Sequence, residues 1–298
     1  MTQIAIIGFG NVGQYAYEAV KSAPDMEVCC IVKTPRRPVP PEMENRWVTD
    51  IQDIRRFGDV DAAILCLPSR ACPDAAETLL KMGINTVDSY DVHTNIWDVK
   101  CRLDLVAKEN NAAAVISAGW EPGSDSVVRA LMEAMAPRGI SYTDFGPGMS
   151  MGHSVAVKAV EGVENALSMT IPAGAGIHRR MVYVQLKDGA DFTKIEQAIK
   201  TDPYFAHDET HVQQVDDISA LLDMGHGVHM TRKGVSGDTH NQMMEFSMRI
   251  NNPALTGQVL VSSARAAVKQ APGCYTLIEI PVIDMLPGDR ADLIRRLV

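Results

Sequence analysis

The stretch "IAIIGFGNVGQYAYEAV", residues 4–20, begins as a continuous apolar run and ends with apolar residues at helical spacing. Three glycines separate the two patterns. In this G-x-G-x-x-G arrangement, Gly8 permits a tight turn, Gly10 lets a pyrophosphate approach the backbone, and Gly13 lets strand and helix pack closely. The free N–H groups at the start of the helix attract phosphates. We therefore expect a dinucleotide-binding turn, and a glycine-rich turn without a ligand is the alternative.

The alternation of strand and helix patterns continues through the first 120 residues. Amphipathic stretches such as "CPDAAETLLKMG" separate short apolar runs, which are "EVCCIV", "AAILCL", "NTVDS" and "AAVISAG". This order predicts an α/β domain of the Rossmann type, a doubly wound parallel sheet with helices on both faces.

The pattern changes from Trp120 onward, where runs such as "MVYVQL" and "NQMMEFSMRI" alternate as strands of a more open sheet do. We expect a dinucleotide-binding domain over residues 1–119 and a second, α+β domain over residues 120–272. The apolar run "GCYTLIEIPVIDM" leads us to expect that residues 273–298 pack back on the first domain.

The composition argues against several classes of protein. The chain has 298 residues, of which 46% are hydrophobic and 22% are charged, enough for a sizeable core. Its formal net charge of -9 argues against nucleic acid or an anionic membrane as the main partner, because both require an excess of Lys and Arg. No apolar stretch reaches the roughly 20 residues of a membrane span, and the first residues lack a signal-peptide pattern. We expect a cytoplasmic protein whose six cysteines are reduced and mostly buried.

The residues after the second predicted strand indicate which dinucleotide binds. An acidic residue there would bind the ribose 2′-hydroxyl of NAD, but the sequence reads "IVKTPRRPVP". Lys33, Thr34, Arg36 and Arg37 suit a 2′-phosphate instead, because guanidinium groups bind phosphate oxygens in pairs. The sequence therefore favours NADP over NAD, and a merely solvated basic loop is the alternative.

Two other motifs suggest different chemistry and are rejected. "GMSMG", residues 148–152, followed by His153, matches the G-x-S-x-G turn of serine hydrolases. That turn needs a strand leading into the serine, and "FGPG" just upstream is expected to break a strand. His226 and His229 in "DMGHGVHM" have a spacing that a metal could use on a helix, but the glycines predict a loop. We therefore expect neither a nucleophilic serine nor a metal site.

Polar side chains follow several of the predicted strands. "NTVDSYDVH" places Asp88 and Asp91 at the end of a core strand, and "AVISAGWEPGSDS" does the same with Trp120 and Glu121. This edge of a parallel sheet is where ligands of such folds bind. Arg180 precedes an apolar strand in "GIHRRMVYV". Each residue alone is more often a cap, a turn or a solvated residue, but together they indicate a site.

These motifs, taken in order, resemble those of the meso-diaminopimelate D-dehydrogenase family, NADPH-dependent enzymes that act on the D-centre of meso-2,6-diaminopimelate. The resemblance covers nearly the whole chain. It lies in "GFGNVG", "NTVDSYDVH", "SAGWEPG", "FGPGMSMGHS", "TIPAG", "HRRMVYV", "GHGVH" and "NNPALT". Other two-domain nicotinamide enzymes fit less well, because the chain has neither the E-K-P of sugar dehydrogenases nor the H-H-R-H-K of dihydrodipicolinate reductases.

The resemblance implies a homodimer in which the second domain serves substrate binding and dimerisation. It implies these substrate-binding residues: Asp91, Trp120, Glu121, Phe145, Met151, Gly152, Thr170, Arg180, His226 and Asn252. It implies these cofactor-binding residues: Gly8, Phe9, Gly10, Asn11, Val12, Gly13, Lys33, Thr34, Arg36, Arg37, Cys66, Leu67, Pro68, Ser69, Ser89 and Tyr90. Two positions depart from the family pattern. Glu121 replaces the usual Asp, and Phe145 replaces the tryptophan of some members.

The reaction implied is oxidation of the D-centre to an imine, which water converts to L-2-amino-6-oxopimelate and ammonia. The cofactor performs the difficult step. Arg180, His226 and Thr170 would bind the distal end of the substrate, and the carboxylates of Asp91 and Glu121 would serve the reacting amine as catalytic residues. The sequence leaves the general base open. The alternatives are an NADP-dependent dehydrogenase for a broader range of D-amino acids and an NADP-binding sensor without turnover.

Overall fold

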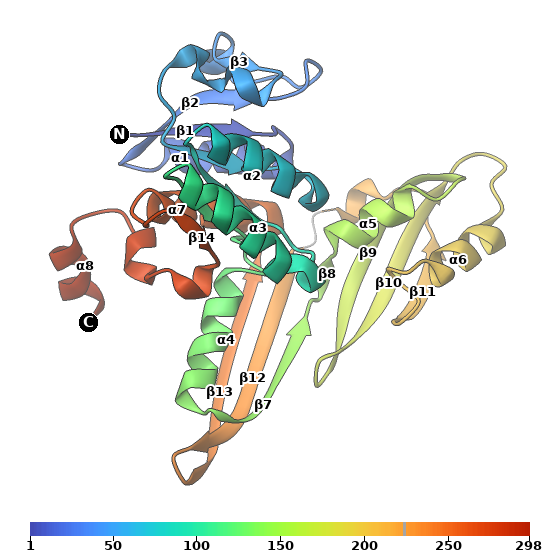
Figure 1. Cartoon of the computed structure of the whole chain (residues 1–298). Coiled ribbons are helices and arrows are strands. Elements are labelled where there is room, and N and C mark those ends of the chain that lie inside the picture. The colour runs from blue at the N-terminus through green and yellow to red at the C-terminus, as the bar shows by residue number, and fades with distance from the viewer. Residues whose placement is uncertain (223–224) are drawn as a thin grey trace. The chain divides into compact units, whose positions relative to one another are not determined.

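A computed structural model describes residues 1–222 and 225–298, without the side chains of Met151 and Ala220 (Figure 1). The chain forms two compact units. The first comprises Met1–Ala130 and Pro253–Val298, and the second comprises Leu131–Asn252. Among the described residues, the helices are all too short or too polar to cross a membrane.

The first unit is built on a sheet of seven strands in the order β14-β6-β5-β4-β1-β2-β3. Every neighbouring pair in it is parallel. The strands are β1 (Thr2–Ile7), β2 (Met26–Val32), β3 (Trp47–Val48), β4 (Ala62–Leu65), β5 (Asn85–Asp88), β6 (Ala113–Val115) and β14 (Gly273–Tyr275). The chain runs outward in one direction from β1 to β2 and in the other from β4 to β6, so the strand order reverses between β1 and β4. This confirms the doubly wound parallel sheet predicted from the sequence.

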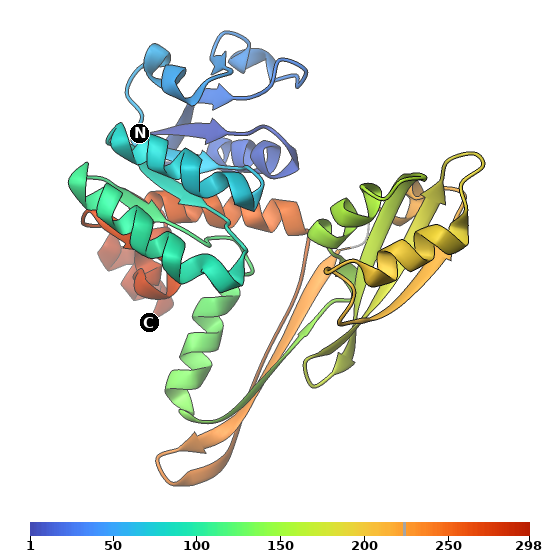
Figure 2. The same cartoon turned by 45° about the vertical axis from the view of Figure 1, so that its right-hand side comes forward.

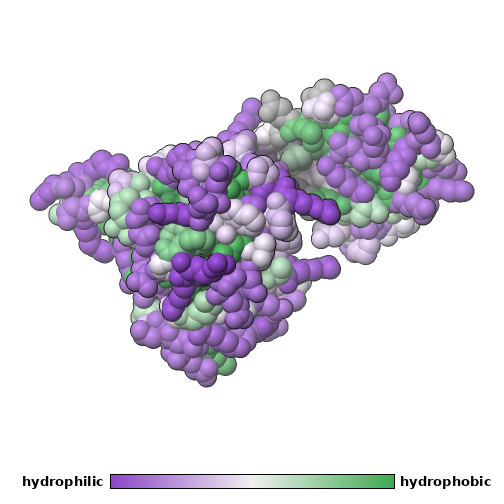
Figure 3. Space-filling view, turned by 90° about the horizontal axis from the view of Figure 1, so that it is seen from above, coloured by the Kyte–Doolittle hydropathy of each residue, from purple (hydrophilic) through white to green (hydrophobic). Residues whose placement is uncertain are grey.

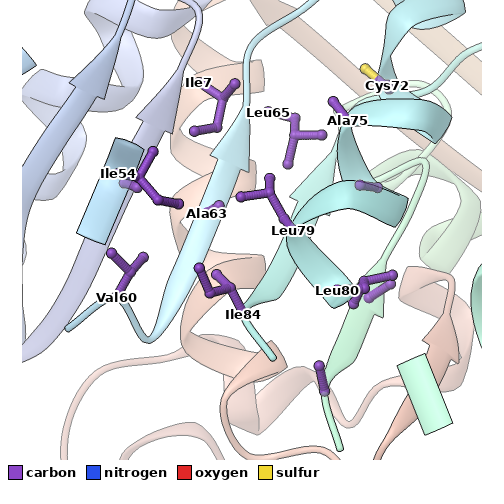
Figure 4. Packing of buried hydrophobic residues seen from close by; sticks show 14 of the residues in the cluster. Ile7, Ile54, Val60, Ala63, Leu65, Cys72, Ala75, Leu79, Leu80 and Ile84 are labelled. Carbon is purple, nitrogen blue, oxygen red and sulfur yellow. The ribbon is translucent and has the colours of Figure 1, made fainter. Parts of the chain in front are cut away.

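Helices cover both faces of this sheet, because its strands are apolar on both sides. On one face, α2 (Cys72–Lys81) and α3 (Ile96–Glu109) pack through a core that contains Leu79 and Leu80 of α2 and Ala63 and Leu65 of β4 (Figure 4). On the other face lie α1 (Asn11–Lys21) and α7 (Asn252–Ala267). The short helix α8 (Arg290–Leu297) ends the chain.

The turn from β1 to α1 is closely packed. Gly8 has a φ of +94°, in the region that favours glycine, and a Cβ there would lie 2.5 Å from the carbonyl oxygen of Cys66. A Cβ on Gly13 would lie 2.2 Å from the carbonyl oxygen of Gly8. Gly10 differs, because a Cβ there would meet no atom within 4 Å. Two of the three glycines are therefore required by the fold itself.

The second unit contains two smaller sheets. One has the order β11-β10-β9-β8 and the other the order β13-β12-β7. Their strands are β7 (Arg138–Phe145), β8 (Gly148–Met149), β9 (Val163–Gly174), β10 (Ile177–Leu186), β11 (Glu209–Gln214), β12 (His226–Ser236) and β13 (Thr239–Ile250). The helices α5 (Met151–Lys158) and α6 (Phe192–Thr201) share a core with β9 and β10 (Figure 2). Hydrophilic side chains dominate the molecular face that Figure 3 shows.

The boundaries of the two units differ from those expected. Helix α4 (Ser124–Met135) begins in the first unit and continues into the second, so the change occurs at residue 130 rather than 119. The chain rejoins the first unit at Pro253, before α7, rather than at residue 273. The reason is that Val259, Leu260 and Val261 of α7 are buried in the same core as α1.

One expectation about local structure was wrong. His226 and His229 lie on strand β12 rather than in a loop. Gly225 and Gly227 are needed there for a different reason, because a Cβ on Gly225 would lie 2.9 Å from the carbonyl oxygen of Ile250 on β13. Close approach between backbones therefore explains glycines that the sequence suggested were loop formers.

The packing at the first turn makes a prediction about stability. Alanine normally stabilises a helix relative to glycine, but Gly13→Ala forces the backbone of Gly8 to move and should lower stability by about 1–3 kcal/mol. Gly10→Ala is the matched control and should cost less than about 1 kcal/mol, since the new methyl group meets only open space. Thermal unfolding followed by circular dichroism compares the two variants. Equal unfolding midpoints would show that the contact between Gly13 and Gly8 does not constrain the turn.

Candidate functional site

The first unit brings most of the predicted cofactor residues to one edge of its sheet. The loops that carry them follow the carboxyl ends of β1, β2, β4 and β5, which the parallel arrangement places side by side. These residues are Gly8, Phe9 and Gly10 after β1, Lys33, Thr34, Arg36 and Arg37 after β2, Cys66, Leu67, Pro68 and Ser69 after β4, and Ser89 and Tyr90 after β5. Asn11, Val12 and Gly13 form the first turn of α1.

The glycine turn can receive a phosphate group. Gly10 is the N-cap of α1, so the free N–H groups of the first turn follow a residue whose Cβ would meet no atom within 4 Å. Behind the turn, the ring of Phe9 is buried and packs edge-on against Tyr17 with ring centroids 6.0 Å apart. The space beside Gly10 lies open at the point where the strand order reverses, which fits a dinucleotide pyrophosphate.

The cationic side chains in the basic loop after β2 differ in their exposure. The ammonium of Lys33 is buried and lies 3.7 Å from the ring centroid of Trp47, a cation–π contact within the protein. Arg36 and Arg37 are exposed, as is Thr34. The two arginines are therefore accessible to a phosphate, whereas the ammonium of Lys33 already contacts an aromatic ring.

The far end of this loop is attached to α1. Glu42 accepts a hydrogen bond of 2.7 Å from the hydroxyl of Tyr17 and one of 2.9 Å from the ammonium of Lys21. These hydrogen bonds hold the pKa of Glu42 low, at about 2. The carboxylate stays ionised and ties the basic loop to the helix that follows the glycine turn.

The loops after β5 and β6 are joined by a buried carboxylate. Asp88 ends β5 and accepts hydrogen bonds from the backbone N–H of Tyr90, at 2.9 Å, and of Ser117, at 3.3 Å. Its backbone oxygen accepts a further bond from the N–H of Ala118 at 2.7 Å. Burial raises the pKa of Asp88 to about 6. Asp88 therefore positions the segments that carry Asp91 and Glu121.

Three acidic residues, Asp91, Glu121 and Asp125, lie at this edge of the sheet. We call them the acidic cluster. The pKa of Glu121 is raised to about 7, mainly by burial, and the charges of Asp125 and Asp91 contribute to the rise while Arg129 opposes it. Asp125 is fully buried and accepts a hydrogen bond of 2.9 Å from Arg129. A carboxyl group with a pKa near neutrality can take up or release a proton at physiological pH.

Two further side chains border the acidic cluster. The Nε2 atom of His93 lies 3.5 Å from Oε1 of Glu121, and both side chains keep some exposure. Trp120 is buried, and its carbonyl oxygen accepts hydrogen bonds from the N–H of Asp125, at 3.0 Å, and from the hydroxyl of Ser124, at 3.3 Å. The start of α4 thus holds Trp120 and Glu121 in place.

The second unit carries the cationic part of the predicted site. Thr170 of β9 stands directly opposite Arg180 of β10, and Thr210 of β11 is the next residue in the same row. The Nη1 atom of Arg180 donates to the hydroxyl of Thr170, and its Nε donates to Oδ2 of Asp208 at 2.6 Å. Side chains in one row point to the same face of a sheet, so the register itself brings Thr170 to Arg180.

The charge of Arg180 affects three histidines. Burial lowers the pKa of His153 to about 4 and lowers the pKa values of His178 and His226 below their usual range, with Arg180 adding to each shift. The three imidazoles are therefore neutral near pH 7. Nε2 of His178 accepts a hydrogen bond from the N–H of Phe145 at 2.7 Å, and the two rings are tilted by 33° with centroids 5.6 Å apart. His226 is buried at the start of β12.

The hydrolase-like motif has more of its expected geometry than the sequence suggested. Strand β7 ends at Phe145, so "FGPG" does break a strand as expected, but the two-residue strand β8 then leads into Ser150 and α5 follows it. Ser150 lies 2.8 Å from Nδ1 of His153. However, Ser150 has a φ of −92° and acts as the N-cap of α5, which is not the strained turn of a hydrolase nucleophile. His153 is half-buried and packs edge-on against the rings of Tyr204 and Phe205.

The remaining predicted substrate residues are less informative. Gly152 is exposed in the first turn of α5, and Asn252 begins α7. The side chain of Met151 lies outside the described residues. The sequence reasoning missed Asp125, His178 and Asp208, because only the fold reveals that they contact or face Glu121, Phe145 and Arg180. Within residues 1–222 and 225–298, no three His, Cys, Asp or Glu side chains are grouped as a metal would need.

Comparisons with known proteins place the chain in a family. Residues 119–179 and 173–252 match the model of the diaminopimelic acid dehydrogenase C-terminal domain, and residues 1–89 match that of a CoA binding domain. The chain is similar to a meso-diaminopimelate D-dehydrogenase of Bacteroides fragilis, with 59% identity over 99% of this chain and 98% of that protein.

Two solved structures have the same fold over the full length of the chain. One is the C. glutamicum DAP dehydrogenase in complex with DAP, with a TM-score of 0.89, 29% identity, and coverage of 100% of this chain and 99% of the other. The second is an engineered D-amino acid dehydrogenase bound to NADP+, with a TM-score of 0.85, 28% identity and the same coverage. On this evidence of sequence and fold, the chain belongs to the meso-diaminopimelate D-dehydrogenase family.

Proposed function

We propose that the protein catalyses the reversible, NADP-dependent oxidative deamination of the D-centre of meso-2,6-diaminopimelate to L-2-amino-6-oxopimelate and ammonia. The observation that carries the proposal is the acidic cluster at the edge of the sheet where the dinucleotide-binding turn also lies. The relative with 59% identity is named for this activity, and a solved neighbour contains DAP.

The residues present fit NADP. The space beside Gly10 receives the pyrophosphate, and Arg36 and Arg37 bind the 2′-phosphate, for which a carboxylate would be repulsive. A solved neighbour with 28% identity is described as bound to NADP+. When bound, the nicotinamide accepts a hydride from the Cα atom of the D-centre.

The acidic cluster accepts a proton from the reacting amine and balances its positive charge. The substrate arrives with an ammonium group, and its proton must leave before the nitrogen lone pair can form the C=N bond as the hydride departs. Glu121 is the proton acceptor, because its raised pKa gives the carboxylate a useful affinity for a proton. Asp91, exposed beside it, balances the charge of the ammonium and then of the iminium ion. Water adds to the iminium carbon, and ammonia leaves.

The second unit binds the distal end of the substrate. Arg180, oriented by Thr170, binds the distal carboxylate through its guanidinium. The neutral imidazole of His226 can hydrogen-bond the same group without adding a charge. Phe145, Met151, Gly152 and Asn252 complete the binding surface, as the family resemblance implies.

We assign cofactor binding to the first unit, and substrate binding and dimerisation to the second. The dimer is supported by large apolar side chains that the second unit exposes, among them Leu131, Met135, Ile140 and Met243. A cytoplasmic location is supported by the cysteines, all six of which are free thiols.

The direct test mixes the purified protein with NADP and meso-diaminopimelate and follows absorbance at the NADPH maximum together with ammonia release. A broader D-amino-acid dehydrogenase would reduce NADP with simple D-amino acids at comparable rates. A sensor would bind NADP and release no ammonia from the meso isomer, which would exclude the proposed activity.

The basic loop makes a prediction about cofactor choice. Replacing both Arg36 and Arg37 by Ala removes charge-assisted bonds to the 2′-phosphate, so the KM for NADP should rise by about tenfold or more while the KM for NAD changes little. Gly10→Ala is the matched comparison, because a methyl group beside the pyrophosphate should weaken the binding of both NADP and NAD. Equal losses for NADP and NAD in the arginine variant would show that the two arginines do not recognise the phosphate.

The raised pKa of Glu121 leads to a prediction about how the activity depends on pH. Its carboxyl must be ionised to accept the proton, and its pKa is about 7, so kcat/KM for deamination should rise as the pH passes upward through about 7. The reverse reaction, reductive amination, needs Glu121 in its protonated form, so its kcat/KM should fall over the same pH range. Glu121→Gln should lower kcat and remove this step from the pH profile. An unchanged profile in the variant would assign the proton transfer to another group.

The role assigned to Arg180 leads to a prediction about how the distal end of the substrate is bound. Leaving a desolvated carboxylate without its partner costs about 2–5 kcal/mol, so Arg180→Met should lower kcat/KM for meso-diaminopimelate by roughly thirty- to several-thousand-fold. The dissociation constant for NADP, measured by fluorescence titration, should not change, because Arg180 belongs to the second unit. Activity equal to that of the parent protein would rule out a role for Arg180 in substrate binding.

A further inference from the structure

Asp208 forms an ion pair with Arg180 that the sequence did not suggest. It lies just before β11, where its N–H donates to the carbonyl oxygen of Phe205 at 3.0 Å and its own carbonyl accepts the hydroxyl of Thr210 at 3.1 Å. Phe205 is fully buried, so the backbone of Asp208 is held against the core of the unit. The position of this carboxylate is therefore determined by the fold.

Arg180 and Asp208 both have hydrogen-bonding groups that their ion pair does not use and that a ligand could bind. Nε and Nη1 of Arg180 serve Asp208 and Thr170, two of the five N–H donors of a guanidinium. The hydrogen bond from Arg180 to Asp208 uses Oδ2, and a carboxylate has two oxygens that each accept. The side chains of Arg180 and Asp208 keep 15% and 27% of their surface exposed. The two opposite charges are thus adjacent, partly desolvated and accessible.

We propose that Asp208 binds the distal ammonium group of the substrate while Arg180 binds the carboxylate on the same carbon. The inference rests on the proposed function. The distal end of diaminopimelate is an amino-acid head whose ammonium and carboxylate share one carbon atom, so its partners must also be neighbours of opposite charge. The pair of Arg180 and Asp208, 2.6 Å apart, meets this requirement. The three histidines affected by the charge of Arg180 are neutral and do not cancel the charge of Asp208.

Asp208 could instead serve only to orient Arg180. The two roles differ in which substrates they affect. A residue that only orients Arg180 acts on every substrate with a distal carboxylate. A residue that binds the distal ammonium acts only on substrates that possess one. The comparison of meso-diaminopimelate with D-2-aminopimelate separates these cases, because the second compound has the same chain and both carboxylates but lacks the distal ammonium.

The experiment measures kcat/KM for both compounds in the parent protein and in Asp208→Asn. We expect the parent to prefer meso-diaminopimelate, and we expect this preference to fall by about tenfold or more in the variant, the effect of one charged hydrogen bond. Both rates falling by the same factor, with the preference unchanged, would overturn the proposal and leave Asp208 as a positioning residue.

Two controls make the result specific. Glu209→Gln removes the carboxylate of the adjacent ion pair, in which Arg179 donates to Glu209 at 2.7 Å, and should leave both rates and the preference unchanged. Arg180→Met should lower the rates for both substrates, since both have the distal carboxylate. If the parent protein does not oxidise meso-diaminopimelate, the proposed function itself fails. If the parent does so and Asp208→Asn keeps the preference, only the present inference fails.

Discussion

The parallel alignment of the strands in the first unit is the constraint on which the chemistry depends. Parallel strands end at the same edge, so the loops after β1, β2, β4, β5 and β6 gather there although they are distant in sequence. The alignment requires backbones to approach closely, which Gly8 and Gly13 allow at the first turn. Asp88 then fixes the loops after β5 and β6 to each other through backbone N–H groups. Without these contacts, neither the phosphate-binding turn nor the acidic cluster would have a defined geometry.

The two units use charge in opposite ways. In the first, burial makes Glu121 costly to ionise, and the charges of Asp125 and Asp91 add to this cost. A bound ammonium group would relieve this cost, so the cluster favours a cationic amine. In the second, the guanidinium of Arg180 is paired with the carboxylate of Asp208, and its charge helps to keep the nearby imidazoles of His153 and His226 neutral. Each unit by itself thus carries charged groups of a different kind, carboxylates in the first and a guanidinium in the second.

Much of the fold could be predicted from the sequence because the responsible signals are local. The period of apolar residues predicted β1, β2, β4, β5 and the helices between them, and the glycine spacing predicted the first turn. The expectations that failed involved long-range packing. Helix α7 is assigned to the first unit by burial against α1, and the glycines near His226 are explained by the neighbouring strand β13. In both cases the cause lies in a part of the chain that is distant in sequence.

The sequence by itself determined the residue types of the site, the order of the elements, and the position of charged residues at strand ends. It could not determine which side chains meet, because contacts such as those of Arg180 with Thr170 and Asp208 join residues that are 10 and 28 positions apart. Only the tertiary structure decided these pairs, through strand register and through burial. It also decided that Glu121 has a pKa near 7, since that value depends on desolvation and on neighbouring charges rather than on the residue itself.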